Sequence, residues 1–372
     1  MTDTAPDLSI VATSRNDDHG GGMLRRMQIF VDGLLQQARR HDLNAELILV
    51  EWNPPADRPR LVQALAWPQE PGPCIVRIIE VPPELHRRFK YSDKLPLFQM
   101  IAKNVGIRRA RGAFVLATNV DLLFSDELTH FLASGQLDPD CMYRVDRYDV
   151  RTDVPVGVPI EDQIEYCRQN VIRVNMQEGS HSERSSRGLR RSVISILVQL
   201  HLASPYDLWK DLTDPQALRR LIRRRVSGVK RLNRQLHTNG CGDFTLLSRE
   251  RWLRLRGYPE WEMYSMHLDG VLCHMALEDG ARQVVLPEPH RLYHIEHHSG
   301  WTPEQTQTLR ARMASLGVPM LDLVEYEDSM ARRGKGAGPI TVNGETWGLA
   351  HETLRETTLH EIGGLRATES PS

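Results

Sequence analysis

Two polar side chains, Asn119 and Asp121, follow directly after a short apolar segment, residues 113–117. This segment predicts a buried strand, because it is continuously apolar and comes after a break at Gly112. An acidic side chain that leaves such a strand is desolvated unless it meets a cation or hydrogen-bond donors. An acid beside an Asn can hold a hard divalent cation on a phosphate. We therefore expect Asp121 to be a metal ligand with Asn119 beside it, although capping of the following helix would also explain an acid here.

A second group of ligand-type side chains lies late in the chain, where His294, Glu296, His297 and His298 occur within five residues. If this segment is extended, His294, Glu296 and His298 share one face of a strand. The H-E-x-x-H pattern of zinc proteases is absent. The residues alone do not decide which imidazole binds, so we take His294 and His297 as candidate metal ligands, with His294 as the first choice.

The elements that would position these groups alternate between strands and helices. Strands are predicted at residues 8–12, 46–50, 74–79 and 113–117, and helices at 23–40 and 94–111. This alternation is typical of a doubly wound, mostly parallel α/β sheet, which binds ligands at the carboxyl edge of its strands. After residue 124 the pattern indicates a mixed sheet, with a strand at 141–148, a helix at 268–279 and a strand at 282–286.

Composition limits the classes of protein that this chain can belong to. Its 372 residues, 40% of them hydrophobic, can build one large core or two smaller ones, and a net charge of −1 gives no reason to expect a nucleic-acid partner. The five scattered cysteines suit a reducing compartment. No signal peptide and no bilayer-spanning run is predicted, so we expect a cytoplasmic protein.

The region around the first site resembles the nucleotide-sugar-binding half of GT-A glycosyltransferases, especially the family-2-like group. Those proteins show N-x-G-x-x-x-A-x-G, a strand, and then D-x-D. The matching residues here are Asn104, Gly106, Ala110, Gly112 and Asp121. Asn119 stands in place of the first Asp of D-x-D, and a neutral amide is a poorer metal ligand than a carboxylate.

The resemblance implies a GT-A fold, with a Rossmann-like nucleotide-binding half and a mixed-sheet acceptor half. It also implies that the donor nucleotide is contacted by Thr13, Ser14, Arg15, Asp17, Glu51, Asn104, Arg109 and Asn119, with Glu51 accepting a hydrogen bond from the base. Simpler explanations stay open. Residues 13–17 can be a polar turn, and Arg109 near a helix C-terminus also complements the helix dipole.

A second block of the sequence resembles the acceptor half of inverting GT-A enzymes. It comprises a Gly-rich turn at 239–244, the Arg256-Gly257-Tyr258 segment, and Asp269 at the start of the predicted helix. In that family an acid at this position deprotonates the attacking hydroxyl, so Asp269 is the predicted catalytic base and Asp243 a second candidate. An acid that only complements the helix N-terminus remains the alternative for Asp269.

These observations together predict a glycosyltransferase of the hexosyltransferase type, inverting and assisted by Mn²⁺ or Mg²⁺. Its donor would be a nucleotide-diphosphate sugar and its acceptor a saccharide or a lipid-linked hydroxyl, as in polysaccharide biosynthesis. A non-catalytic nucleotide-binding protein and a GT-A-like nucleotidyltransferase are the alternatives. We expect a nucleotide-sugar-binding half at 1–125, an acceptor half at 126–325, and a flexible linker and tail at 326–372.

Within the acceptor half we expect an insertion near residues 180–235 that is rich in Arg and Lys. Part of it, residues 217–226, places cations at helical spacing. Such a face can contact an anionic membrane peripherally or an anionic acceptor. A solvated lid or loop is the alternative.

Overall fold

The computed structural model describes residues 5–69, 72–177, 179–182, 236–297, 303–322, 326 and 340–358. Residues 183–235, which hold nearly all of the predicted basic insertion, and the Gly-rich linker at 332–339 lie outside these residues. Among the described residues, no helix combines the length and the apolarity that crossing a bilayer requires.

The N-terminal part alternates strands and helices as its sequence pattern predicts. Its elements are β1 (Leu8–Ser14), α1 (Met23–Arg40), β2 (Ala45–Trp52), α2 (Leu61–Ala64), β3 (Cys74–Val81), α3 (Pro83–His86), α4 (Gln99–Arg109) and β4 (Phe114–Thr118). Helix α4 begins later than the predicted residue 94. One reason is that the Pro96 carbonyl accepts side-chain hydrogen bonds from Arg15 and Asn53 instead of a helical amide.

The rest of the chain mixes strand directions. Its elements are β5 (Leu122–Phe124), α5 (Asp126–Ala133), β6 (Cys141–Val145), β7 (Arg147–Val150), α6 (Ile160–Gln169), β8 (Val171–Met176), β9 (Gly179–Ser182), β10 (Phe244–Ser248), α12 (Arg249–Leu255), α13 (Leu268–Glu278), β11 (Arg282–Leu286), β12 (Leu292–Ile295), α14 (Pro303–Ser315) and β13 (Arg355–Thr358). The single strand predicted at 141–148 is wrong: the chain crosses at Asp146 from one sheet to the other, which makes it two strands, β6 and β7.

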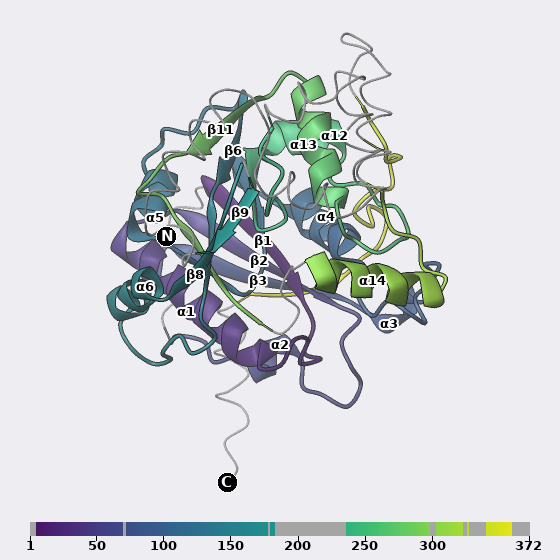
Figure 1. Cartoon of the computed structure of the whole chain (residues 1–372), viewed down its shortest axis with the longest axis horizontal. Coiled ribbons are helices and arrows are strands. Elements are labelled where there is room, and N and C mark those ends of the chain that lie inside the picture. Colours follow the sequence, from purple (N-terminus) through teal and green to yellow (C-terminus); the bar gives the residue numbers. More distant parts are fainter. Residues whose placement is uncertain are drawn as a thin grey trace.

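The main sheet has the strand order β11-β6-β10-β4-β1-β2-β3-β13, and its centre, β4-β1-β2-β3, is parallel. Helices cover both of its faces, with α1 and α5 on one side and α4, α12 and α13 on the other (Figure 1). The prediction of a doubly wound, mostly parallel α/β sheet joined to a mixed part is therefore confirmed. This arrangement places the loops after β1, β2 and β4 at one edge.

A second sheet, β5-β12-β7-β8-β9, packs against α6 and part of α1 through Ile29, Leu123, Tyr148 and Tyr293. Strand β5 follows β4 after only three residues, and it pairs with β12 from the far end of the chain. The end of the parallel sheet is thereby brought next to the histidine-rich segment.

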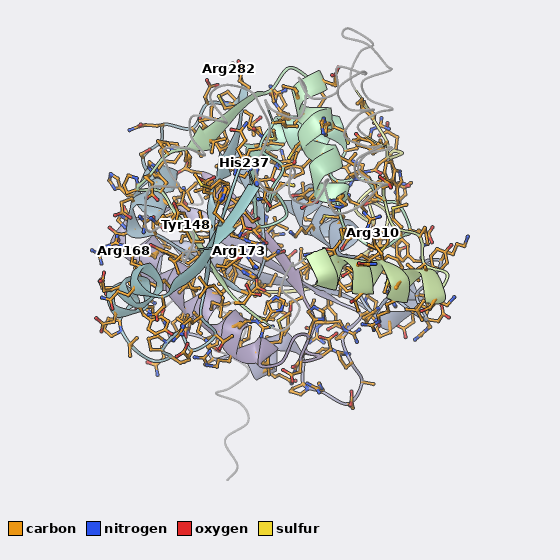
Figure 2. The ribbon with its side chains drawn as sticks, in the orientation of Figure 1. Tyr148, Arg168, Arg173, His237, Arg282 and Arg310 are labelled. Atoms are coloured by element: carbon orange, nitrogen blue, oxygen red, sulfur yellow. The ribbon has the colours of Figure 1, made fainter. Side chains whose placement is uncertain are left out.

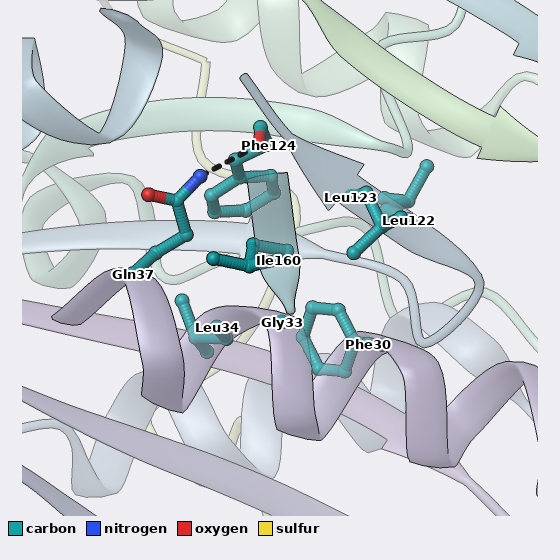
Figure 3. Close-up of a pocket in the computed structure, with 8 residues that line it drawn as sticks. All are labelled: Phe30, Gly33, Leu34, Gln37, Leu122, Leu123, Phe124 and Ile160. Atoms are coloured by element: carbon teal, nitrogen blue, oxygen red, sulfur yellow. Dashed lines mark hydrogen bonds between the residues drawn. The ribbon is translucent and has the colours of Figure 1, made fainter. Parts of the chain in front are cut away.

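A small pocket between α1 and β5 is a packing gap in the described region. It is lined by apolar side chains together with Gln37, whose Nε2 donates to the Phe124 carbonyl oxygen over 3.2 Å (Figure 3). Gly33 permits the close approach of helix and strand, because a Cβ there would lie 2.4 Å from Leu123 Cδ2. The only polar side chain that lines the pocket is Gln37, whose Oε1 is buried without a described hydrogen-bond partner.

The residues of the N-x-G-x-x-x-A-x-G motif are packing residues. A Cβ on Gly106 would lie 2.5 Å from Val11 Cγ1, so this glycine lets α4 lie directly on β1. Asn104 is fully buried, and its amide donates to the carbonyl oxygen of Tyr258 and to Glu260 Oε1 while its Oδ1 accepts from the Tyr258 amide. Asn104 thus joins α4 to the segment after α12.

Replacing Asn104 with Ala should lower the free energy of unfolding by about 2–4 kcal/mol, because it leaves buried donors and acceptors without partners. Urea unfolding followed by circular dichroism would measure the change. The half-buried Asn44, whose amide contacts Ala5 and Asp7, provides a control that should lose less than about 1 kcal/mol on the same substitution. Equal losses in the two variants would show that the Asn104 contacts are not important for stability.

Part of the predicted C-terminal tail is ordered. Residues 355–358 form β13, which pairs antiparallel with β3, and Arg77 binds Glu356 through two nitrogens. Arg109 donates to the carbonyl oxygens of Gly348, Leu349 and Glu352. The prediction of a flexible tail from residue 326 therefore does not hold for residues 340–358. These residues contact β3 and α4, which lie far away in the sequence.

Candidate functional site

Asp121 and His294 meet because β5 pairs with β12. Asp121 lies between β4 and β5, and its carbonyl oxygen accepts a hydrogen bond from the Ile295 amide over 2.9 Å. Three side chains converge there, with His297 Nε2 3.3 Å and His294 Nε2 3.7 Å from the same oxygen, Asp121 Oδ2. The ligand atoms of the three side chains lie within 4.8 Å of one another. We call Asp121, His294 and His297 the triad.

The triad has the properties of a cation site. Asp121 and His294 are buried, and Asp121 Oδ1 accepts no hydrogen bond from the residues that the structure describes. Burial, the largest influence, would raise the pKa of Asp121, but the hydrogen bond from His297 and the charges of His294, His297 and Arg26 outweigh it and hold the pKa well below its usual range. A carboxylate that stays ionised beside two imidazoles suits a divalent cation.

The loop between β1 and α1 closes one side of the triad. Arg26 is buried and donates to the carbonyl oxygen of His19 over 2.7 Å, and the His19 ring lies edge-on to the His297 ring at 6.1 Å. Position 20 requires a glycine, because a Cβ there would lie 2.8 Å from His297 Nδ1. The sequence analysis did not select His19 or Arg26, and the neighbouring Gly20-Gly21-Gly22 run is the local signal that could have drawn attention to this loop.

Asn119 contacts a carboxylate rather than the triad. Its Nδ2 donates to Asp243 Oδ1 over 2.5 Å, and its Oδ1 accepts from Gln99 Nε2 over 3.0 Å. Arg147 donates to the other oxygen of Asp243 over 2.7 Å. A second carboxylate at position 119 would repel Asp243 in this buried setting, so the Asn that replaces the first Asp of D-x-D fits its surroundings.

Asp243 and Asp269, the two candidate bases, have different environments. Both oxygens of Asp243 are engaged by the contacts just described. Asp269 lies in the first turn of α13, half-buried, where its Oδ1 accepts from the Gly270 amide over 2.9 Å. A Cβ on Gly242 would lie 2.8 Å from Asp269 Oδ2, so that glycine leaves room for the carboxylate. Of the two, Asp269 has the oxygen that is better placed to accept a proton.

Lys103 of α4 lies close to these two acids and interacts with the charges of both. Its side chain is fully buried, and its Nζ donates to the Gly242 carbonyl oxygen over 2.6 Å. Burial, the largest influence, lowers the pKa of Lys103 to about 8, opposed by the charges of Asp243, Asp269 and Asp121. Lys103 therefore holds the Gly-rich turn at Gly242, and its positive charge stabilises the carboxylates of Asp243 and Asp269.

The predicted nucleotide loop lies at the carboxyl end of β1, but part of it is committed to internal contacts. Thr13 donates a hydrogen bond to the carbonyl oxygen of Val50 over 3.0 Å. Arg15 donates to the carbonyl oxygen of Pro96 over 3.2 Å, and its Nε lies 3.4 Å from Asp17 Oδ2. The Ser14 hydroxyl is buried without a described partner. Asn104 and Arg109 are held in the packing contacts given above, so we leave these two out of the site proposed below.

Glu51 is buried at the end of β2, and its Oε1 accepts a hydrogen bond from the Leu61 amide over 3.0 Å. It lines a cavity at the sheet edge with Arg60, Glu80 and Arg355. Burial, the largest influence, raises the pKa of Glu51 to about 7, although the Leu61 hydrogen bond opposes this. Glu51 is thus placed where a ligand could reach it and is only partly ionised near neutral pH.

The raised pKa of Glu51 predicts a pH-dependent stability. Between the ordinary value of 4.5 and about 7, the folded chain binds a proton here more tightly than the unfolded chain does, so this contribution is complete below 4.5 and is lost as the pH rises through 7. Glu51→Gln removes it. The stability of the wild-type protein relative to this variant should fall by up to about 3 kcal/mol across that window. Urea unfolding at a series of pH values would measure the difference, with the exposed Glu250→Gln as control; parallel curves for wild type and Glu51→Gln would contradict the prediction.

No known protein-family model matches this chain, and no curated protein matches it. Solved structures are similar to it in fold, among them the following two. One is the mannosyltransferase PcManGT from Pyrobaculum calidifontis in complex with GDP-Man and Mn²⁺, at 13% identity and a TM-score of 0.40, over 89% of this chain and 70% of that one. The other is S. aureus TarS 1–349, at 13% identity and a TM-score of 0.42, over 88% of this chain and 72% of that one. The likeness concerns the fold alone.

Proposed function

We propose that this chain is a GT-A-type glycosyltransferase that moves a sugar from a nucleotide-diphosphate sugar to a hydroxyl acceptor. The observation that carries the proposal is the triad, a buried carboxylate and two imidazoles at the carboxyl edge of a parallel sheet. Ligands of such sheets bind at that edge. Asp269, in the first turn of α13 beside the Gly-rich turn, would add a base to the same region.

In the proposed reaction, the acceptor oxygen attacks the anomeric carbon of the donor sugar while the bond from that carbon to the diphosphate oxygen breaks. The bonding electron pair leaves with the nucleoside diphosphate. Asp269 accepts the proton of the acceptor hydroxyl, as a general base does. A divalent cation held by Asp121, His294 and His297 would stabilise the charge that develops on the leaving diphosphate. This direct displacement inverts the anomeric configuration.

The donor set of the triad favours one class of cation. Imidazole nitrogens suit transition metals, whereas Mg²⁺ prefers oxygen ligands and keeps its waters. The two imidazoles therefore favour a transition-metal ion over Mg²⁺, and we propose Mn²⁺ because it also suits carboxylate and other oxygen ligands. The end of β1, one strand from β4, and Glu51 of β2, two strands from β4, would face the nucleoside of the donor.

Titration calorimetry on metal-free protein tests the proposal, with GDP and UDP as ligands in the presence and absence of Mn²⁺. Binding of one of them should need Mn²⁺ and should be weaker with Mg²⁺. Incubation with a panel of UDP- and GDP-sugars should then release the nucleoside diphosphate slowly in the presence of Mn²⁺. Binding without release would favour a non-catalytic nucleotide-binding protein, and the absence of both would refute the proposal.

A further inference from the structure

The side of His294 that faces away from the triad is held by a residue that the sequence analysis did not select. His294 Nδ1 lies 3.0 Å from Asp149 Oδ1, and the two residues are paired across β7 and β12. Asp149 is fully buried. A carboxylate accepts but does not donate, so this contact requires the hydrogen of His294 on Nδ1. Nε2, the nitrogen that would bind a cation, then faces Asp121 Oδ2 at 3.7 Å.

Asp149 is itself fixed from several directions. Arg147 Nε lies 2.9 Å from its Oδ1, and its Oδ2 accepts from Arg173 Nε and, over 2.9 Å, from Asn175 Nδ2. Figure 2 labels Arg173, which extends from β8 and also binds Glu296. The carboxylate of Asp149 has therefore little freedom to rotate, and the orientation of His294 follows from it.

The group Asp149, His294 and Glu296 also brings three ligand-type side chains close together. It does not have the character of a cation site, because Arg173 binds both carboxylates and Arg147 binds Asp149. Two guanidinium charges already occupy the place of a cation. Asp149 can therefore influence the triad through its contact with the ring of His294.

We propose that Asp149 is the positioning residue for the cation site, fixing the tautomer and the ring orientation of His294 so that Nε2 faces Asp121. The inference rests on the proposed metal-binding role of the triad. Outer-sphere partners of this kind fix the tautomer of a ligating His and raise its basicity, and their loss typically weakens metal affinity about 10–100-fold. Arg147 extends the same network to Asp243 and Asn119.

Mn²⁺ titration of metal-free protein, followed by calorimetry and by the electron paramagnetic resonance signal of free Mn²⁺, tests this inference. Asp149→Asn should weaken Mn²⁺ binding about 10–100-fold. The matched control is Asp146→Asn, which disturbs another carboxylate–histidine contact, that of Asp146 Oδ1 with His237 Nε2 at 3.0 Å (His237 is labelled in Figure 2). That contact lies outside the triad, so the control should bind Mn²⁺ as the wild type does.

A double-mutant cycle with His294→Gln separates positioning from general damage to the fold. If Asp149 acts through His294, then Asp149→Asn should cost no further Mn²⁺ affinity in a protein that already carries His294→Gln. Additive losses, or equal losses in the Asp149 and Asp146 variants, would overturn the inference. A wild-type protein that does not bind Mn²⁺ at all would instead refute the proposed function.

A measurement on the unaltered chain covers the case in which Asp149→Asn does not fold. Proton–nitrogen correlation spectra of the imidazoles, recorded on protein loaded with diamagnetic Zn²⁺, identify the ring nitrogen that carries hydrogen. His294 should carry it on Nδ1 and coordinate through Nε2. A His294 ring with hydrogen on Nε2 would overturn the inference.

Discussion

Replacing Asp121 with Ala is expected to abolish Mn²⁺-dependent binding of a nucleoside diphosphate and, with it, sugar transfer. Asp121 is the only carboxylate in the triad, and one of its oxygens lies within 4 Å of both imidazoles. Two neutral imidazoles without it offer a cation little charge compensation in a buried site. Calorimetry with Mn²⁺ and the nucleoside diphosphate would measure the loss.

Thermal unfolding gives a second measurement of the same prediction. A ligand that binds only the folded state stabilises it by about 2.7 kcal/mol at a concentration 100 times its dissociation constant. Mn²⁺ should therefore raise the unfolding temperature of the wild type and leave that of Asp121→Ala unchanged. The control is Asp126→Ala, because Asp126 starts α5 and pairs with Arg40 and His41 instead of the triad. An Asp121→Ala protein with normal Mn²⁺ dependence would show that the cation, if needed, binds elsewhere.

The fold could be predicted from the sequence because the residues of the N-x-G-x-x-x-A-x-G motif lie where helices and strands pack closely. Gly112, like Gly106, is a point of close approach, since a Cβ there would lie 2.6 Å from the Ser9 amide nitrogen. Asn104 clamps Tyr258 and Glu260, and a Cβ on Gly257 would lie 2.2 Å from Asn104 Oδ1. A motif built from such contacts predicts architecture well. It does not imply that its polar member contacts a ligand.

For the candidate site, the carboxyl ends of strands indicated more of the residues that the structure brings together than the motif did. Asp121 was selected because an acid leaving a buried strand needs a partner, and the structure places it against His294 and His297. Asp149 could not be selected in this way. It lies inside the strand β7, and its role follows from pairing with β12, which local sequence patterns do not reveal. The ordered tail strand β13 was missed for the same reason.

Asp243 illustrates how burial changes the interpretation of a candidate acid. In the sequence it is an acid after a Gly-rich turn, and so it was a candidate for the base. In the structure it accepts from Asn119 and Arg147 and lies near the buried Lys103. Both oxygens of Asp243 are thus committed to contacts with neighbouring side chains. We therefore expect its replacement to disturb the arrangement of Asn119 and Arg147 rather than the basicity of the site.

Replacing Asp269 with Asn is expected to reduce sugar transfer by roughly 10²–10⁴-fold, the range typical of a lost general base. The Asn Oδ1 can still accept from the Gly270 amide, so the first turn of α13 should keep its geometry. Only the basic oxygen that faces Gly242 is lost. Donor affinity, measured by calorimetry with Mn²⁺ and the nucleoside diphosphate, should change by less than about threefold, because the proposed role of Asp269 begins only with the acceptor.

A second variant tests the placement of the Asp269 carboxylate rather than its chemistry. Gly242→Ala puts a Cβ 2.8 Å from Asp269 Oδ2, a distance that forces the carboxylate to move. Transfer should fall here too, by less than in Asp269→Asn, because the displaced oxygen is still basic. If donor affinity collapses in Asp269→Asn while the protein stays folded, Asp269 is a binding residue. If transfer is retained in Asp269→Asn, the proton goes to another group, and an acid that complements only the dipole of α13 becomes the better description.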